Sequence, residues 1–394
     1  MAIAPIKDKE SKVNEPLVGL EDVVVAASSI TFIDGDEGIL RYRGYDVNEL
    51  AEKSNYEEVA YLLIFGRLPT RAEFDVFTKE KRSYRPLPPE FLKLLACLPP
   101  KMDAMAWLRT GVSALEAYNP DPENIGGTAN LRRTLRLTAQ VATVTAAIER
   151  IRKGKPVIAP DLTLDHASNF LYMLTGQKPD ALSRRAMDIA LVLQADHELN
   201  ASTFAGRVTV STMSDMYSAA TTAVGTLKGP LHGGANQRVM EMLDKIGSAD
   251  KVEAFVLQQL AEKKKIMGFG HRVYTNVDPR AAILKQMARE LSEKVGPAKW
   301  YEMSEAMEVI MLSEKKLNPN LDFYSASVYR YLGIDTDLFP LIFATSRVVG
   351  WCTHFMEQYA HNRLIRPVTQ YTGPQWLKYE AIDRRKAAPA PVTR

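Results

Sequence analysis

Cysteine is scarce in this sequence, and neither sign of charge dominates. The 394 residues include only Cys97 and Cys352, which lie far apart and form no C-x-x-C pair. We therefore expect no zinc site and no disulfide framework, and we interpret both cysteines as buried thiols in a reducing compartment. Lys and Arg number 50 against 47 for Asp and Glu, and no long basic run occurs, so no nucleic-acid partner is expected.

Long apolar runs are missing as well. The stretch Leu338–Cys352 is interrupted by Arg347, so no segment approaches the roughly 20 uncharged residues that a membrane-spanning helix needs. Residues Met1–Pro16 carry Lys and Glu without an apolar core, which argues against a secretory signal. These absences predict a cytoplasmic protein that has no membrane partner.

Most of the chain instead shows helical periodicity. Apolar residues recur at three- and four-residue intervals over Asn130–Lys153, and the pattern stops at Gly154. Further helices are expected over residues 180–200, 249–265, 278–295, 300–316 and 337–362. The one β segment, Leu20–Tyr45, has two β-rich runs around the turn Asp34–Gly38 and predicts a hairpin. The expected fold class is therefore all-α with a small N-terminal β-hairpin.

Two segments near the N-terminus have the spacing of a capping box, Ser54-x-x-Glu57 and Thr70-x-x-Glu73. In a capping box the first side chain accepts from a backbone N–H of the new helix, and the glutamate reaches back to the cap residue. Both segments therefore predict the start of a helix.

The sequence around His232 makes a poor helix and a good shaped loop, because G-P-L-H-G-G-A-N at 229–236 combines proline with three glycines. A helix is expected to begin near Ala235. Its positive end disfavours an imidazolium, and a neutral imidazole there can donate a hydrogen bond to a developing oxyanion. The ordinary alternative is a turn histidine that caps the helix.

A second histidine, His271, ends the glycine-containing motif G-F-G-H and precedes D-P-R at 278–280. Alternating glycines allow a ligand to approach the backbone closely. The third glycine and the preceding strand of a dinucleotide-binding motif are both missing. His271 and Arg280 are candidates to converge on a carboxylate, for which arginine offers a two-pronged fork. The lysines at 263–265 either supply charge for phosphates or form a solvated helix end.

His197 lies between Asp196 and Glu198 in an apolar, helical setting. Adjacent polar groups in such a setting form either a satisfied core network or a site, and these residues alone favour the network.

Asp322 follows N-P-N-L at 318–321, which marks a loop, and is expected at the start of the next helix. Helix capping is the ordinary role of such an aspartate. Its aromatic neighbours Phe323 and Tyr324 would desolvate the carboxylate and strengthen it as a base. Arg347 is a cation in an apolar run and needs an anion, whereas Arg366, before Pro367, is on its own evidence a surface arginine.

Taken in order, the motifs resemble the citrate synthase family. The resemblance rests on G-P-L-H-G-G-A-N at 229–236, G-F-G-H at 268–271, D-P-R at 278–280 and N-x-D-F-Y-S at 320–325. R-G-Y-D at 43–46 and the R-P near the C-terminus also fit, and the likeness spans roughly residues 18–378. It implies an acyltransferase of the tricarboxylic acid cycle that condenses acetyl-CoA with oxaloacetate and water, giving citrate and CoA. The implied partners are these two substrates and a second copy of the chain, and no metal or other cofactor is implied.

The resemblance also implies residue roles. Asp322 would remove a proton from the carbon next to the thioester, His232 would stabilise the enolate, and His271 would polarise the ketone of oxaloacetate. Four side chains would hold the dicarboxylate, the last of them from the partner subunit of a homodimer: His197, Arg280, Arg347 and Arg366. The residues implied for coenzyme A are Lys265, Ile266, Met267, Gly268, Phe269, Gly270 and Arg272.

Two domains follow from the same resemblance, a large one from residues 1–222 and 333–394 and a small one, 223–332, that closes over the substrates. Leu108–Leu115, Ser214–Ser218 and Tyr274-Thr275 look more like 2-methylcitrate synthases, which use propionyl-CoA. The resemblance also implies a basic residue for coenzyme A phosphates within Tyr274-Thr275-Asn276, where this sequence has none. One methylene is worth only about 1–3 kcal/mol in a pocket, so 2-methylcitrate synthase is the alternative function. An inactive helical scaffold is the non-enzymatic alternative.

Overall fold

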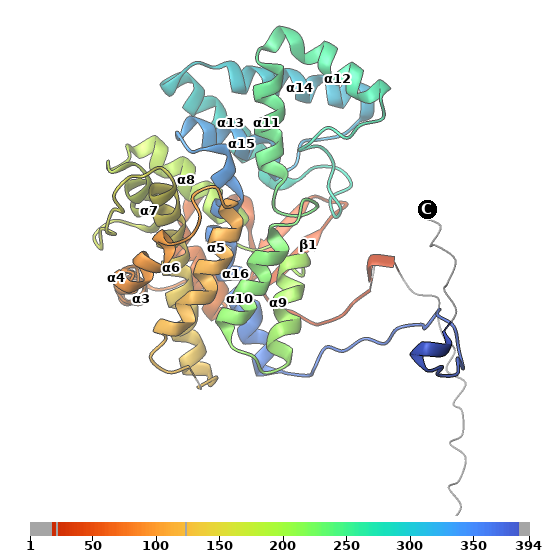
Figure 1. Ribbon diagram of the computed structural model, residues 1–394. Coiled ribbons are helices and arrows are strands. Elements are labelled where there is room, and N and C mark those ends of the chain that lie inside the picture. Colours follow the sequence, from red (N-terminus) through yellow and green to blue (C-terminus); the bar gives the residue numbers. More distant parts are fainter. Residues whose placement is uncertain (1–17, 21–22, 123, 386–394) are drawn as a thin grey trace, which may run out of the picture. The chain divides into compact units, whose positions relative to one another are not determined.

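The computed structural model describes residues 18–20, 23–122 and 124–385, and helices dominate them (Figure 1). Residues Ser28–Ile365 form one compact unit, and the described residues before and after it form a second. The expected all-α fold with one small sheet is confirmed. The predictions for Met1–Pro16 and for the basic tail beyond residue 385 lie outside the described residues.

The sheet is the predicted hairpin with one short extra strand. Strands β1 (Thr31–Asp34) and β2 (Ile39–Tyr42) pair antiparallel, with Thr31 opposite Tyr42, and β3 (Tyr45–Asp46) pairs with β2. The Asp34 side chain accepts the backbone N–H groups of Asp36 and Glu37, which shapes the turn. Leu40 and Tyr42 are fully buried and anchor the hairpin to the helical core.

Sixteen α-helices are present in the described chain. The first eight are α1 Val47–Lys53, α2 Tyr56–Phe65, α3 Arg71–Ser83, α4 Pro89–Ala96, α5 Ala104–Ala114, α6 Gly127–Arg152, α7 His166–Thr175 and α8 Ala181–Gln194. The others are α9 Ala201–Ser211, α10 Met216–Leu227, α11 Ala235–Ile246, α12 Val252–Ala261, α13 Pro279–Val295, α14 Lys299–Lys315, α15 Leu321–Tyr331 and α16 Phe339–Ala360. Short 3-10 helices cover Val18–Leu20 (η1), Leu115–Tyr118 (η2), Ala249–Lys251 (η3), Thr336–Leu338 (η4) and Ile382–Arg384 (η5).

One of the two predicted capping boxes is confirmed. Thr70 and Glu73 form both reciprocal bonds at the start of α3. The prediction at Ser54 is wrong, because Ser54 ends α1 and the neighbouring Asn55 caps α2 with its side chain. Asparagine competes well as a cap, so the start of α2 lies one residue further along.

Helix α16 lies at the centre of the compact unit. It packs against α2, α6, α8, α9 and α10, and its residues from Phe339 to Phe355 are all buried. Most of its side chains are apolar, which suits a helix enclosed by others, and Arg347 is a cation that the core must accommodate. Of the two cysteines, Cys352 is buried in α16 as expected, but Cys97 is exposed at the end of α4. No described helix combines the length and apolar character required to cross a bilayer.

Helices α11–α15 gather at one end of the compact unit (Figure 1). Within this group α13 packs on α15, α11 on α15 and α12 on α14. Helices α13 and α15 also contact α8, so the group is joined to the rest of the unit near the predicted site. Division into domains at residues 222 and 332 stays a prediction.

The contact between α9 and α16 generates a stability prediction at Gly206. A Cβ there would lie 2.3 Å from the buried Phe355 ring and 3.4 Å from Ala219 O. We expect Gly206→Ala to lower the free energy of unfolding by about 1–2 kcal/mol, since overpacking outweighs the gain of about 1 kcal/mol in helix propensity. Urea unfolding measures the change. Gly127→Ala in α6, where a Cβ meets nothing within 4 Å, is the control, and equal stability of both variants would contradict the prediction.

Candidate functional site

The connection between α8 and α9 carries His197, and hydrogen bonds to Asp196 hold this connection in place. The Asp196 carboxylate accepts a hydrogen bond from Thr31 and lies 3.3 Å from Nε2 of His354. The Tyr42 hydroxyl donates to Asp196 O at 2.9 Å. Asp196 therefore belongs to a core network, the alternative that its sequence context favoured. His197 itself points away from this network, with Nε2 3.1 Å from the Tyr274 hydroxyl.

His271 lies beside His197, with ring centroids 5.3 Å apart. Its Nδ1 accepts the backbone N–H of Val273 at 3.0 Å and, at 3.3 Å, that of Tyr274. Backbone N–H groups can only donate, so the ring proton is assigned to Nε2, which remains able to donate to a ligand. Burial, followed by the charge of Arg280, lowers the pKa of His271 to about 4, so the ring is neutral near pH 7.

His232 lies in the loop before α11, which begins at Ala235 as expected. The His232 ring, however, is contacted by the start of α9 and not by α11. The Ser202 backbone N–H, in the first turn of α9, donates to His232 Nε2 at 3.3 Å, and the Ser202 hydroxyl lies 2.8 Å from the same nitrogen. The proton is therefore assigned to Nδ1. Burial, and then the charge of Arg347, lowers the pKa of His232 to about 4.

Ser202 is a site residue that the sequence motifs missed. Its hydroxyl also accepts the indole N–H of Trp351 in α16 at 3.1 Å, so three segments meet at this side chain. The only local signal was the N-cap spacing of Asn200, whose side chain accepts the Thr203 N–H and starts α9.

Asp322 is the second residue of α15, but it does not cap the helix. The cap is Asn320, whose side chain accepts the Asp322 N–H at 3.0 Å. The Asp322 carboxylate accepts no hydrogen bond from the described residues. Burial raises the pKa of Asp322 to about 6, although the charges of Arg280 and Arg347 oppose the rise. The capping alternative is thus wrong, and a half-buried carboxylate is left available as a base.

Arg280 and Asp278 form a buried, two-pronged ion pair, with Nε and Nη2 each 2.8 Å from a carboxylate oxygen. Asp278 is the N-cap of α13, and its Oδ2 also accepts the Leu321 backbone N–H at 2.9 Å. This one carboxylate therefore ties the first turn of α13 to the first turn of α15. Burial disfavours the charged form of Arg280, but the adjacent Asp278 carboxylate outweighs this effect and raises the pKa of Arg280 above its usual range.

Arg347 is almost completely buried and lacks such a partner. Its Nε donates to Gln194 O at 2.6 Å, and its guanidinium lies 4.7 Å from the centre of the Phe343 ring. No carboxylate of the described residues lies within ion-pair distance. Burial lowers the pKa of Arg347 to about 10, which leaves it charged near pH 7. Arg347 is thus a buried cation whose unfavourable burial an anionic ligand would relieve.

The segment assigned to coenzyme A lies beside the start of α15. Gly268 O accepts the Asn320 N–H at 2.9 Å, and Phe269 forms an antiparallel bridge with Pro319. Gly268 has φ +87°, and a Cβ there would lie 2.7 Å from the Phe323 ring, so only glycine fits. The exposure of the seven residues varies: Ile266 and Gly268 are buried, Met267, Phe269 and Gly270 are half-buried, and Lys265 and Arg272 are exposed.

Arg366 is exposed and belongs to the unit formed by the chain ends, outside Ser28–Ile365. Its assignment to the site of a partner subunit stays a prediction.

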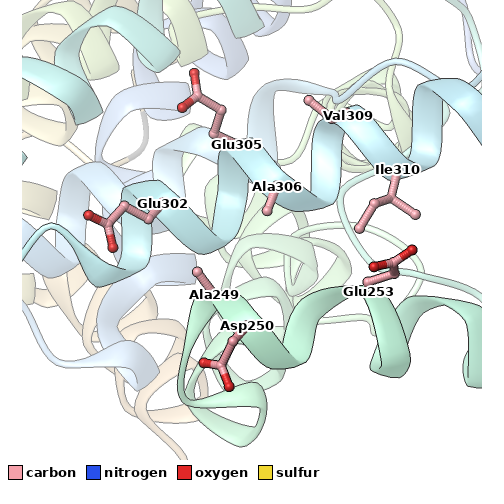
Figure 2. A pocket seen from close by; sticks show the side chains of 8 residues that line it. All are labelled: Ala249, Asp250, Glu253, Glu302, Glu305, Ala306, Val309 and Ile310. Atoms are coloured by element: carbon pink, nitrogen blue, oxygen red, sulfur yellow. The ribbon is translucent and has the colours of Figure 1, made fainter.

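A pocket of about 490 Å³ lies elsewhere, between η3–α12 and α14 (Figure 2). Its lining residues are Ala249, Asp250, Glu253, Glu302, Glu305, Ala306, Val309 and Ile310. Four of these are acidic and none is basic, so the pocket would repel a dicarboxylate or a coenzyme A phosphate.

The raised pKa of Asp322 predicts a stability change with a definite pH dependence. The native state holds this proton up to about pH 6, whereas the unfolded chain loses it near 3.8, so native stability falls as the pH rises between these values. We expect Asp322→Asn to raise the free energy of unfolding by about 1–3 kcal/mol at about pH 7.5, with a gain that shrinks toward about pH 4. Urea unfolding across this range measures the change, and a less stable variant at the higher pH would contradict it.

Comparison with known proteins agrees with the motifs. A family model described as citrate synthase, C-terminal domain, matches residues 19–368. Citrate synthase 2 of Bacillus subtilis is 47% identical over 368 residues, covering 93% of this chain and 98% of that protein. Citrate synthase of Haloferax volcanii is 48% identical over 372 residues, with the same two coverages.

Among solved structures, the citrate synthase of Thermoplasma acidophilum in a ternary complex with carboxymethyl coenzyme A and oxaloacetate is similar with a TM-score of 0.88. It is 36% identical, and the match covers 93% of this chain and 98% of that one. The resemblance inferred from the motifs is thereby confirmed, and the chain belongs to the citrate synthase family of enzymes.

Proposed function

We propose that this enzyme condenses acetyl-CoA with oxaloacetate and water to give citrate and CoA, with Asp322, His232 and His271 as the reacting groups. The observation that carries this proposal is the Asp322 carboxylate, which has a raised pKa and accepts no hydrogen bond from the described residues. A base of this kind, combined with neutral imidazoles that retain an N–H, suits the removal of a proton next to a carbonyl.

The first step is enolisation. Asp322 takes a proton from the methyl carbon of acetyl-CoA, and the electron pair of the broken C–H bond moves toward the thioester oxygen. The Nδ1–H of His232 donates to that oxygen and stabilises its developing charge. A neutral imidazole is suitable here because it stabilises the enolate oxygen by a hydrogen bond and does not have to transfer its proton first.

The second step joins the two substrates. The enolate carbon attacks the ketone carbon of oxaloacetate, a C–C bond forms, and the ketone oxygen takes the proton from Nε2 of His271. Water then cleaves the thioester of the resulting citryl-CoA, which releases citrate and the thiol of CoA. Asp322 gives up the proton it took, His271 regains one, and one proton is released overall. Closure of a small domain, residues 223–332, over these steps would exclude water while the enolate exists.

Oxaloacetate carries two carboxylates, and we assign two buried arginines to them, one with an uncompensated charge and one as a hydrogen-bond donor. Arg347 lacks a carboxylate partner in the described chain, and Arg280 is oriented by Asp278. His197 adds a neutral hydrogen-bonding group beside His271. The ternary complex of the Thermoplasma acidophilum relative, which contains oxaloacetate and a coenzyme A derivative, supports this pair of ligands.

We place coenzyme A along Lys265–Gly270 and Arg272, where the conformation of Gly268 brings the backbone close to α15.

The active form in this proposal is a homodimer, in which Arg366 of one subunit completes the site of the other. Beyond Arg366 the described chain exposes large apolar side chains, including Tyr371, Trp376 and Tyr379 at 66%, 94% and 85%. Exposed aromatic side chains on a chain end favour a protein partner.

Two unpaired thiols support a cytoplasmic location.

Of the alternatives, 2-methylcitrate synthase is not favoured, because both relatives compared above are citrate synthases. The mechanism would be the same, so a comparison of kcat/KM for thiol release with acetyl-CoA and propionyl-CoA decides the acyl preference. An inactive scaffold does not fit a chain in which the base and both donors are present.

The base assignment predicts the pH dependence of the reaction. Asp322 must be ionised to act, so the rate constant for enolisation should fall about tenfold per pH unit below about 6, while both histidines stay neutral down to about 4. Thiol release at saturating substrates measures this acid limb. Asp322→Ala should lose at least about a hundredfold in kcat with the dimer intact, and near-wild-type turnover would refute the assignment.

Sharing of Arg366 predicts complementation between two inactive variants. Arg366→Ala and Asp322→Ala homodimers should each be nearly inactive. In their hybrid one site has its own Asp322 and the partner's Arg366, so random mixing should restore about one quarter of wild-type activity. Activity is measured after the two variants are unfolded and refolded together. No recovery, while wild-type protein survives the same treatment, would place Arg366 in its own subunit's site, and an active Arg366→Ala homodimer would place it outside both sites.

A further inference from the structure

The turn of the β1–β2 hairpin lies against the segment that follows His271. Thr275 donates its backbone N–H to Gly35 O at 3.0 Å and its hydroxyl to the Asp36 carboxylate at 2.9 Å. Asn276 donates its side-chain amide to Asp36 O at 3.0 Å. These partners are about 240 residues apart in sequence, so the contact joins the start of the compact unit to the loop before α13.

Two glycines allow this close approach. A Cβ on Gly35 would lie 2.0 Å from Val273 O, and one on Gly38 would lie 2.8 Å from Val277 O. Gly35 does not have a positive φ, so its backbone is open to any residue and only the proximity of Val273 excludes a side chain. The hairpin turn and the loop are thus fitted to each other at backbone level.

The strands of the same hairpin reach the other histidine loop. Thr31 of β1 donates to the Asp196 carboxylate, and Tyr42 of β2 donates to Asp196 O. The next residue is His197, whose Nε2 lies 3.1 Å from the Tyr274 hydroxyl. One hairpin therefore contacts both loops whose histidines lie 5.3 Å apart.

The contacted loop also orients His271 and adjoins the proposed base. The backbone N–H groups of Val273 and Tyr274 set the His271 ring, as described above. The Asn318 side chain donates to Asn276 O at 2.8 Å, which links the loop to the segment that precedes Asp322. A shift of residues 273–277 would therefore move the donor for the ketone relative to the rest of the site.

We propose that the β1–β2 hairpin is a positioning brace, which holds the His271 loop against the His197 loop through Gly35, Asp36 and Thr275. The kinetic part of the proposal rests on the proposed function, whereas the structural part does not. The brace also gives Thr275 a role that its sequence context did not indicate. Its hydroxyl donates to a carboxylate of the hairpin instead of adding charge for a phosphate.

Hydrogen–deuterium exchange tests the brace without reference to catalysis. Thr275→Val removes the hydroxyl and keeps the shape, and Gly35→Ala inserts a methyl group where Val273 O lies. We expect amides of residues 271–278 to exchange about threefold to tenfold faster in Thr275→Val and faster still in Gly35→Ala. Thr275→Ser should restore wild-type exchange.

Two matched controls separate the brace from general destabilisation. Thr163→Val removes a similar hydrogen bond, from the Thr163 hydroxyl to the Asp161 carboxylate (2.6 Å), in the connection between α6 and α7. Gly127→Ala adds a methyl group that meets nothing within 4 Å. Neither control should change exchange over residues 271–278.

Steady-state thiol release then tests the kinetic part. We expect Thr275→Val to raise the KM for oxaloacetate about threefold to tenfold and to lower kcat, with a smaller change in the KM for acetyl-CoA, because His197 and His271 face the dicarboxylate. Thr275→Ser should restore both constants. A loss caused only by partial unfolding would lower the active fraction and leave KM unchanged.

The outcomes are distinguishable. Unchanged exchange over residues 271–278 in both Thr275→Val and Gly35→Ala, relative to their controls, would overturn the brace. Faster exchange with unchanged kinetic constants would show that the hairpin holds the loop but does not position His271 for the reaction, which would overturn the positioning role. If the wild-type enzyme itself releases no thiol, the proposed function fails, and the exchange comparison still decides whether the hairpin holds the loop.

Discussion

The carboxylate of Asp278 determines the position of more site groups than any other side chain described above. It caps α13, orients Arg280 with two hydrogen bonds and accepts the first backbone N–H of α15. Asp322 is the next residue of α15, so its place relative to Arg280 follows from this interaction. Because the ion pair is buried, removal of either partner would leave an uncompensated charge in the core, and the two helix starts remain tied together.

Burial also determines the protonation state of each reacting group. It disfavours the charged form of every ionisable side chain, so it raises the pKa of Asp322 to about 6 and lowers those of His232 and His271 to about 4. Near pH 7 the result is an ionised base with two neutral donors. The same environment leaves Arg347 charged without a carboxylate partner in the described chain, so the free energy of binding an anion there includes relief of an unfavourable burial.

Local sequence patterns predicted the hairpin and several of the helices, although the helix expected over 180–200 ends at Gln194. The helices at 279–295, 299–315 and 339–360 coincide closely with stretches of apolar periodicity, and the turn Asp34–Gly38 lies where glycine and aspartate interrupt two β-rich runs. Predictions of capping were less reliable. Asn55, not Ser54, caps α2, and Asn320, not Asp322, caps α15. Several residues near a helix start can accept the same N–H groups, and only the three-dimensional path of the chain selects one.

By itself the sequence determined that this protein is helical, that it carries the citrate synthase motifs, and which residue types are available for chemistry. The tertiary structure decided which of these residues meet. Ser202 contacts His232 through the start of α9, Asp196 serves the core while its neighbour His197 faces Tyr274, and the hairpin turn reaches Thr275 across about 240 residues. Such contacts join segments that are remote in the chain, and a local pattern contains no information on them because packing of the whole core brings them together.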